Sequence, residues 1–230
     1  MPTPPTRRPA VTAGRLPRVT SAVAVCAHPD DESFGLGGLL HALGAAGSRI
    51  AVLCFTHGEA STLHGVDGDL GAVRARELAE AGRHLGAGRV ELLGYPDGSL
   101  AAQRADELAG HVRRVAGEVG ADALVVFDLG GVTGHPDHDA ATRAALTAAD
   151  RLDVTVLAWT VPDTVAHTLN GELGTAFAGR ARHEVDAVLA VDRRAQLAAI
   201  GCHASQARHN PVLRRRLELQ GPVEWVRMLR

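Results

Sequence analysis

Short apolar runs recur along the chain, and an Ala-rich stretch separates most runs from the next. The runs cover residues 22–27, 50–55, 90–93, 123–127, 154–159 and 187–191. Their apolar residues are continuous rather than alternating, which is typical of strands covered on both faces. The intervening stretches predict helices over residues 35–47, 71–86, 100–119, 137–150 and 193–207.

Alternation of strands and helices implies parallel strands joined by right-handed crossovers. We therefore predict an α/β fold of the doubly wound, Rossmann-like type, with a mostly parallel sheet and helices on both faces. No internal repeat or low-complexity linker follows residue 19, so we expect a single domain over residues 20–230. Residues 1–19 are rich in Pro and Arg and predict a flexible N-terminal tail.

Two later segments do not follow the strand and helix pattern. Residues 162–182 contain Pro and several Gly, and they predict a loop with a short helix over one end of the sheet. Residues 211–230 include three consecutive arginines at positions 214–216 and predict a helix with a solvated, charged face. A phosphate-binding patch is the alternative interpretation of the arginines.

The charges nearly cancel, and this limits the classes of partner. The chain has 24 basic and 26 acidic residues, for a formal net charge of -2. This balance offers no basic surface for nucleic acid or anionic membrane. No stretch reaches the roughly 18 apolar residues of a membrane span, and the N-terminus lacks the apolar region of a signal peptide. We expect a small-molecule partner, and a homo-oligomer is compatible with the sequence.

Lysine is absent, and the cysteines are few. All 24 basic residues are arginines, which excludes a Schiff-base lysine and a lysine-containing P-loop. Cys26, Cys54 and Cys202 are an odd number without C-x-x-C spacing, so they predict neither a disulfide framework nor a thiolate zinc site. A reducing compartment fits best, and we expect a cytoplasmic protein.

The first chemical cluster directly follows the first apolar run. It reads His28-Pro29-Asp30-Asp31-Glu32. So many ionisable groups at a strand end would repel one another or resist burial unless a cation lay among them. Imidazole and carboxylate are ordinary zinc ligands. The alternative is that the acidic residues only complement the dipole at the start of the next helix.

The second cluster follows the fourth apolar run and reads His135-Pro136-Asp137-His138. Pro136 fits the first position of a helix, which places the two histidines on one side of the helix start. A surface histidine pair is the alternative. Both clusters lie at predicted strand ends, where ligands bind in open α/β sheets. Together they indicate a catalytic metal pocket, and a hydrolytic zinc site leaves one position for water.

The two motifs in combination resemble the PIG-L/LmbE-like family of zinc-dependent N-acetylglucosaminyl deacetylases. The resemblance runs from about Val23 to Gln206 and includes weaker matches around Arg74, around Asp97 and at residues 203–206. It implies a Zn²⁺ cofactor and a single deacetylase domain of this family. The family hydrolyses N-acetylglucosaminyl groups.

By matching positions, the resemblance makes His28, Asp31 and His138 the zinc ligands. Asp30 becomes the general base that takes a proton from a water activated by the metal. The chemistry of amide cleavage agrees with these roles, because the reaction needs an activated water and a group to accept its proton. We interpret Glu32 as a support for the ligands.

The resemblance also assigns His135 as an imidazolium that stabilises the oxyanion or protonates the departing amine, with Asp137 setting its charge and orientation. It places Arg74 and Asp97 against sugar hydroxyls. A solvated helix position for Arg74 and an ordinary turn position for Asp97 are the alternatives. Thr133 stands where some sugar-thiol deacetylases have a tyrosine, so a phenol hydroxyl is missing at that position.

We predict a zinc hydrolase that removes an N-acetyl group from a 2-amino sugar or small glycoside. One alternative is a zinc amidase that cleaves a larger N-acyl group or a thiol-conjugate amide. A more remote alternative is a non-catalytic nucleotide- or sugar-binding module of Rossmann type. The glycines at positions 35, 37 and 38 do not match G-x-G-x-x-G, and neighbouring acidic groups would repel a pyrophosphate.

Overall fold

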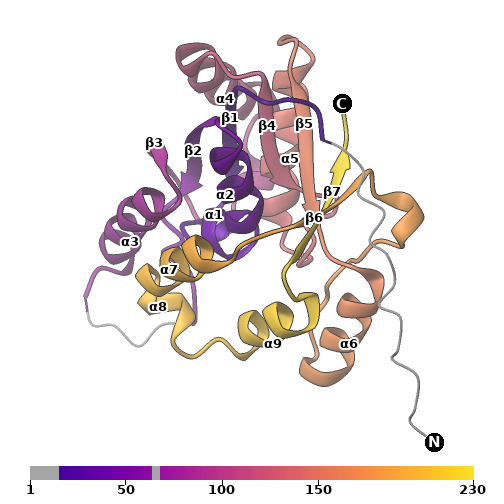
Figure 1. The fold of residues 1–230 in the computed structure, drawn as a ribbon. Helices are drawn as coiled ribbons and strands as arrows, with labels where there is room; N and C mark the ends of the chain where they lie inside the picture. The colour runs from indigo at the N-terminus through magenta and orange to yellow at the C-terminus, as the bar shows by residue number, and fades with distance from the viewer. Residues whose placement is uncertain (1–15, 64–67) are drawn as a thin grey trace, which may run out of the picture.

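The computed structural model describes residues 16–63 and 68–230. These residues form one seven-stranded sheet with the order β3-β2-β1-β4-β5-β7-β6 (Figure 1). The strands are β1 (Ser21–Cys26), β2 (Arg49–Thr56), β3 (Ala87–Tyr95), β4 (Ala123–Phe127), β5 (Thr155–Thr160), β6 (Ala187–Ala190) and β7 (Val223–Met228). Pairs among β1 to β5 are parallel. The predicted doubly wound α/β fold is confirmed.

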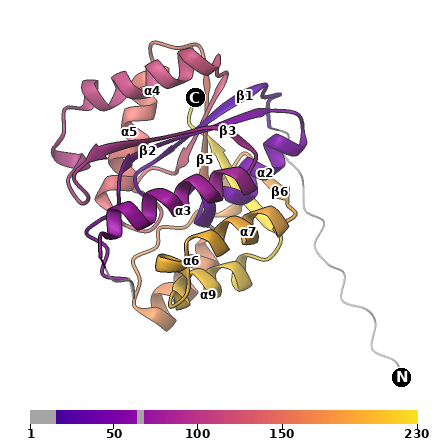
Figure 2. The same cartoon turned by 90° about the vertical axis from the view of Figure 1, so that its left-hand side faces the viewer.

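The helices lie on both faces of the sheet, as Figure 2 shows. They are α1 (Asp31–Phe34), α2 (Gly37–Ala45), α3 (Leu70–His84), α4 (Ala105–Val119), α5 (Pro136–Ala149), α6 (Asp163–Leu173), α7 (Arg194–Cys202), α8 (Ala204–Ala207) and α9 (Pro211–Gln220), with 3₁₀ turns η1 (Leu100–Ala102) and η2 (Arg182–Glu184). Each sheet face has its own hydrophobic core. Alternate β1 residues enter the core under α2 and α3 or the core under α4 and α5.

The prediction of one helix over residues 211–230 is wrong beyond Gln220. Gly221, at φ 63, ends α9, and the following residues form β7. This strand pairs antiparallel with β5 on one side and with β6 on the other. A glycine with positive φ commonly ends a helix, because a side chain is strained in that conformation. The mostly parallel sheet therefore contains one antiparallel strand near its edge.

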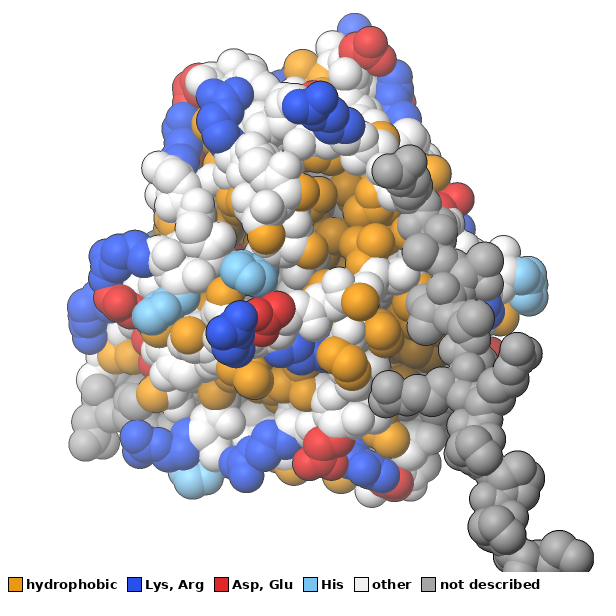
Figure 3. All heavy atoms as spheres, in the orientation of Figure 1, with side chains coloured by type: hydrophobic (Ala, Val, Ile, Leu, Met, Phe, Trp, Pro, Cys, Tyr) orange, Lys and Arg blue, Asp and Glu red, His pale blue; other side chains and the backbone are white. Residues whose placement is uncertain are grey.

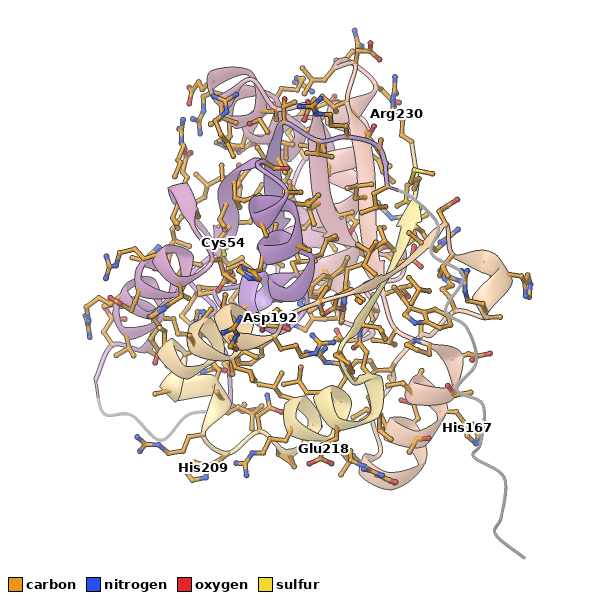
Figure 4. All side chains as sticks on the ribbon, viewed as in Figure 1. Cys54, His167, Asp192, His209, Glu218 and Arg230 are labelled. Atoms are coloured by element: carbon orange, nitrogen blue, oxygen red, sulfur yellow. The ribbon has the colours of Figure 1, made fainter. Side chains whose placement is uncertain are left out.

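The solvated face predicted for the three arginines is also wrong for Arg216. Leu213, Arg216 and Gln220 are buried on one side of α9, whereas Glu218 points outward at the bottom of Figure 4. Arg215 pairs with Glu172 of α6 at 2.7 Å. Helix α9 therefore packs over the sheet end beside α6, and the segment predicted as a loop with a short helix contains the eleven-residue α6.

Most of the predicted N-terminal tail, residues 1–15, lies outside the described residues. The last part of the predicted tail packs against the domain, because Val19 is buried and Ser48 Oγ donates a hydrogen bond to its carbonyl oxygen. Hydrophobic side chains gather over the middle of the face drawn in Figure 3, and most charged side chains lie around it. None of the helices in the described part of the chain is both long and apolar enough to cross a membrane.

Candidate metal centre

The two sequence clusters meet at the carboxyl end of the sheet. Strand β1 pairs with β4, so the turn after β1 and the start of α5 lie side by side at this edge, as parallel strands require. His28 Nδ1 lies 3.2 Å from His138 Nε2. The rings of His28, His135 and His138 offer nitrogens that all lie within 4.8 Å of one another. The prediction that the clusters come together is confirmed.

Two separations among the proposed donor atoms match those of a tetrahedral zinc site. His138 Nε2 lies 3.1 Å from Asp31 Oδ1 and 3.2 Å from His28 Nδ1. Zinc bonds of about 2.0–2.1 Å place neighbouring donors of a tetrahedron roughly 3.3 Å apart. The second oxygen of Asp31, Oδ2, accepts backbone hydrogen bonds from Ala27 and His28, both at 2.9 Å. These contacts fix the carboxylate, and the donor set fits zinc.

Two further carboxylates face the second nitrogen of His28. Its Nε2 lies 3.0 Å from Asp97 Oδ1 and 3.5 Å from Asp137 Oδ2. Carboxylates commonly orient a metal-binding histidine in this way. Burial lowers the pKa of His28, but the contacts with Asp137 and Asp97 outweigh it and raise the pKa to about 10.

The Asp137 carboxylate is held by backbone groups of the loop after β3. Asp137 accepts hydrogen bonds from Gly98 N at 2.8 Å and Leu100 N at 3.0 Å. Asp137 Oδ2 lies 3.5 Å from His28 Nε2, and the backbone N–H of Asp137 donates to His135 Nδ1 at 3.2 Å. Asp137 thus acts on His28 through its side chain and on His135 through its backbone N–H, and its negative charge raises the pKa of His135 against the larger lowering by burial.

His138 is oriented by the loop that precedes α5. Its Nδ1 lies 3.0 Å from Thr133 Oγ1 and 3.2 Å from the carbonyl oxygen of Gly131. Gly131 has φ 73, and a Cβ there would lie 2.9 Å from His138 Cβ. Only glycine tolerates both the conformation and the close approach. Thr133 therefore takes part in the site through its hydroxyl.

Asp30 lies beside the ligands in an unusual backbone conformation. Its φ is 122, and its N–H donates to Glu32 Oε2 at 3.0 Å. Positive φ strains a non-glycine residue, and such strain collects at functional sites. Burial raises the pKa of Asp30 to about 6, although the Arg74 guanidinium opposes the shift.

Arg74 is buried, so the alternative of a solvated helix position is wrong. It donates to the carbonyl oxygens of Gly58 at 2.6 Å and Pro29 at 2.5 Å, and it lies 3.0 Å from Asp30 Oδ2. Gly58 has φ 64, and a Cβ there would overlap the guanidinium. Arg74 links the turn after β1 to the turn after β2 and holds the Asp30 carboxylate.

His135 is the N-cap of α5 and is half-buried. Its Nδ1 accepts the N–H of Asp137 at 3.2 Å, and its ring centroid lies 4.6 Å from that of His28. Burial lowers the pKa of His135, and the neighbouring His28 and His138 rings lower it further. These surroundings favour the neutral imidazole, whereas the family resemblance implied an imidazolium.

Glu32, interpreted from sequence as a support for the ligands, forms a fully buried pair behind Asp30 with His203, which was assigned no role. His203 Nε2 lies 2.7 Å from Glu32 Oε1, and Ser33 Oγ donates to the same oxygen at 2.5 Å. His203 lies at the break between α7 and α8. The weak sequence match at residues 203–206 was the available signal for it.

The residues of the candidate metal site surround a cavity of about 530 Å³ at the carboxyl end of the sheet. Seven of the eight sequence-predicted site residues line it, namely His28, Asp30, Asp31, Arg74, Asp97, His135 and His138. Asp137 is buried behind His28. Asp97 is no ordinary turn residue, because it also accepts a hydrogen bond from Ala60 N at 2.9 Å. The volume lies within the range of about 300–1,000 Å³ typical of small-molecule sites.

Comparison with known proteins gives matches in sequence and in structure. Residues 23–149 match the PIG-L family, described as GlcNAc-PI de-N-acetylase. A 1D-myo-inositol 2-acetamido-2-deoxy-alpha-D-glucopyranoside deacetylase of Streptomyces avermitilis is 34% identical over 151 residues, which are 55% of this chain and 51% of that protein. The chain thus spans about half the length of this curated relative.

Solved structures share the fold at low identity. N,N'-diacetylchitobiose deacetylase from Pyrococcus horikoshii has a TM-score of 0.67 and 20% identity, covering 92% of this chain and 84% of that one. GalB, the 4-carboxy-2-hydroxymuconate hydratase of Pseudomonas putida, has a TM-score of 0.69 and 17% identity, covering 92% and 96%. A deacetylase and a hydratase have this fold, so the function must be argued from the site.

Proposed function

The chain belongs to the PIG-L family, and from this premise we propose that it is a zinc-dependent hydrolase that removes an N-acyl group, acetyl in the first instance, from a 2-amino sugar or small glycoside. The observation that carries the proposal is that His138 Nε2 lies 3.1 Å from Asp31 Oδ1 and 3.2 Å from His28 Nδ1. Bound there, zinc would polarise the amide carbonyl and lower the pKa of water to about 7.

Asp30 is proposed as the general base. It lines the cavity beside the ligands without being one of the three donors. Its raised pKa, about 6, suits a carboxylate that accepts a proton near neutral pH and then releases it. Glu32 fixes its backbone N–H and Arg74 its carboxylate, so the base is held in place before substrate arrives.

We propose that His135 acts on the reacting amide from the side opposite Asp30. It lines the cavity next to His28. Because Nδ1 accepts the backbone N–H of Asp137, a neutral His135 ring carries its proton on Nε2. That proton can stabilise negative charge on the carbonyl oxygen or pass to the departing amine. Asp137 supports the reaction through His28.

Asp97 and Arg74 are proposed to face the sugar. Both line the cavity, together with Ser61, Thr62 and Gln206 from neighbouring segments. Carboxylate, hydroxyl and amide groups match the donors and acceptors of a sugar ring. Arg74 also holds Asp30, so we expect it to affect both substrate binding and the base.

We propose a cytoplasmic location and a small N-acylated amino sugar as the partner, with neither nucleic acid nor a membrane span involved. The three cysteines are free thiols in the structure, two of them buried. Free thiols are typical of a reducing compartment. The nearly balanced charge of -2 supports a small-molecule partner over a polyanion.

The test is zinc content and acetate release measured on one preparation. The purified chain, incubated with zinc and freed of excess metal, should retain about one zinc per chain and release acetate from N-acetylglucosamine or its p-nitrophenyl glycoside. Asp30→Asn should keep the zinc and lose at least about a hundredfold in kcat, within the contribution of a general base. Asp153→Asn, at an exposed aspartate, is the matched control. Full activity of Asp30→Asn, or zinc retention by His138→Ala, would refute the assignment.

A further inference from the structure

Aromatic side chains are scarce in this chain, yet most of them lie in one place. The sequence contains four phenylalanines, two tryptophans and one tyrosine. Phe34, Phe127, Phe177 and Trp159 all line the cavity that contains the candidate metal site. With Leu213 of α9 they form a continuous lining, which we call the apolar wall. Phe127 and Trp159 also belong to the hydrophobic core and are 7% and 2% exposed, so the open part of the wall comes mainly from the half-buried Phe34 and Phe177.

Part of the apolar wall and part of the polar lining lie on opposite sides of strand β1. In the sheet order β3-β2-β1-β4-β5, the ligands His28 and Asp31 follow the central β1. Ser61, Thr62 and Asp97 follow β2 and β3 on one side. Phe127 and Trp159 belong to β4 and β5 on the other side. An amide held at the metal site would therefore have polar residues on one side and apolar residues on the other.

The side chains of the apolar wall are held in place by contacts with one another and with neighbouring residues. Phe127 and Trp159 pack with ring centroids 5.1 Å apart, and Phe127 also contacts the His138 ring at 4.6 Å. Arg216 lies 5.3 Å from the centroid of the Trp159 ring and donates to the carbonyl oxygen of Phe34 and, at 2.9 Å, to Gln220 Oε1. These contacts fix the floor of the wall, whereas Phe34 and Phe177 are half-buried at its sides.

We propose that the apolar wall binds the acyl group of the substrate, and that the preferred acyl group is an aromatic or alkyl group larger than acetyl. This inference rests on the proposed function and specifies its substrate. The sugar of an N-acyl amino sugar lies on the nitrogen side of the amide, where hydroxyls need polar partners. An aglycone on C1 lies on the same side as the sugar. The acyl chain lies across the carbonyl from both, so it meets the apolar wall.

Size and burial support the same assignment. A cavity of about 530 Å³ lies in the range that holds a ligand much larger than acetamide. A methyl group would leave the half-buried part of the apolar wall, Phe34 and Phe177, uncovered. Burial of a larger acyl group against it removes apolar surface from water, and each buried methylene contributes roughly 10- to 200-fold in discrimination.

The experiment compares acyl groups on one sugar. Glucosamine carrying N-acetyl, N-hexanoyl, N-phenylacetyl or N-succinyl is incubated with the zinc-loaded full chain, and kcat/KM is obtained from the free amine released. We expect the hexanoyl or phenylacetyl compound to exceed the acetyl compound by about tenfold or more. Calorimetry on the metal-free chain should show tighter binding of phenylacetate than of acetate, independently of turnover.

Variants test whether the apolar wall causes the preference. Phe177→Ala should lower the ratio of phenylacetyl to acetyl kcat/KM about tenfold, and Val212→Phe, which fills the cavity from α9, should lower it as well. Leu197→Ala removes an exposed side chain of α7 that is 52% accessible and lies outside the cavity lining. It should leave both rates unchanged.

The outcomes separate this inference from the proposed function. Efficient hydrolysis of the acetyl compound with weaker hydrolysis of the larger acyl groups would overturn the inference and leave the deacetylase function standing. A preference for the succinyl compound would overturn it in favour of charge recognition by Arg216. Release of amine from none of the compounds by a zinc-containing chain would overturn the proposed function as well.

Discussion

His203 Nε2 lies 2.7 Å from Glu32 Oε1, and both side chains are fully buried. Glu32 also receives the N–H of Asp30 through its other oxygen. The pair therefore connects the break between α7 and α8 with the backbone of the proposed base. Burial lowers the pKa of His203, but the Glu32 carboxylate outweighs burial and raises it.

Removing one member of this buried pair should destabilise the fold strongly. We expect His203→Ala to lower the free energy of unfolding by about 3–5 kcal/mol, because Glu32 would remain as an unpaired buried charge. Urea denaturation measures the loss. The double variant His203→Ala/Glu32→Gln should recover part of it, since no buried charge is left alone. An equal or greater loss in the double variant would contradict the charge argument.

The pH dependence of Asp122 offers a test away from the site. Burial raises the pKa of Asp122, but hydrogen bonds from Thr20 and Ser21 outweigh it and lower the pKa. A carboxyl group with a lowered folded pKa stabilises above its unfolded value of about 3.9, and this contribution is lost as the pH falls through the folded pKa.

Asp122→Asn should therefore destabilise the chain by about 1 kcal/mol at pH 7, which is the scale of a net hydrogen bond. The difference in unfolding free energy between the variant and the parent chain should shrink as the pH falls from 5 to 2.5. Asp106→Asn, at an exposed residue of α4, is the control. A difference that stays constant over this range would contradict the assignment.

The strand ends could be predicted from sequence, because continuous apolar runs mark the parallel strands and the polar clusters follow them directly. Strand β7 could not, because its buried positions hold both Glu224 and Val226. The buried Glu224 carboxylate is reached by Arg193 and Trp159, which lie in distant parts of the sequence, at 2.5 and 2.7 Å, and by Gln220 at 2.6 Å. No local pattern carries that information.

The candidate site likewise contains residues that the sequence indicated and partners that it did not. The two local motifs predicted a shared metal pocket at one edge of the sheet, and the family resemblance selected His28, Asp31 and His138 as its ligands. The partners that hold these residues come from elsewhere: Asp97 faces His28 from the loop after β3, and His203 reaches Glu32 from the end of α7. The burial of Arg216 depends on the packing of α9 over Trp159, which a run of three arginines does not indicate.

Arg74 should act on the proposed base through geometry as well as charge. Its guanidinium spans the carbonyl oxygens of Pro29 and Gly58 and the Asp30 carboxylate. A lysine ammonium cannot bridge these acceptors in one plane. Arg74→Lys should retain zinc but lose about tenfold to a hundredfold in kcat, the order expected for misplacement of a catalytic group. A rise in KM with unchanged kcat would assign Arg74 to sugar binding alone.

We expect Gly35 to be required for the packing of Phe127 and Trp159 against the turn after β1, which carries His28 and Asp31. A Cβ at Gly35 would overlap the Phe127 ring and lie 3.2 Å from Trp159 Cζ3. Gly35→Ala should therefore displace Phe127, which contacts His138, and cost about 1–3 kcal/mol in unfolding free energy. Gly44→Ala in α2 is the matched control, because its nearest neighbour would be Ile50 Cγ1 at 3.7 Å. That change should stabilise the helix by about 0.5–1 kcal/mol. Zinc affinity should fall in Gly35→Ala but not in Gly44→Ala, because only the methyl group at position 35 presses on the Phe127 ring, which contacts the ligand His138. Equal zinc affinity in the two variants would show that Phe127 does not position His138.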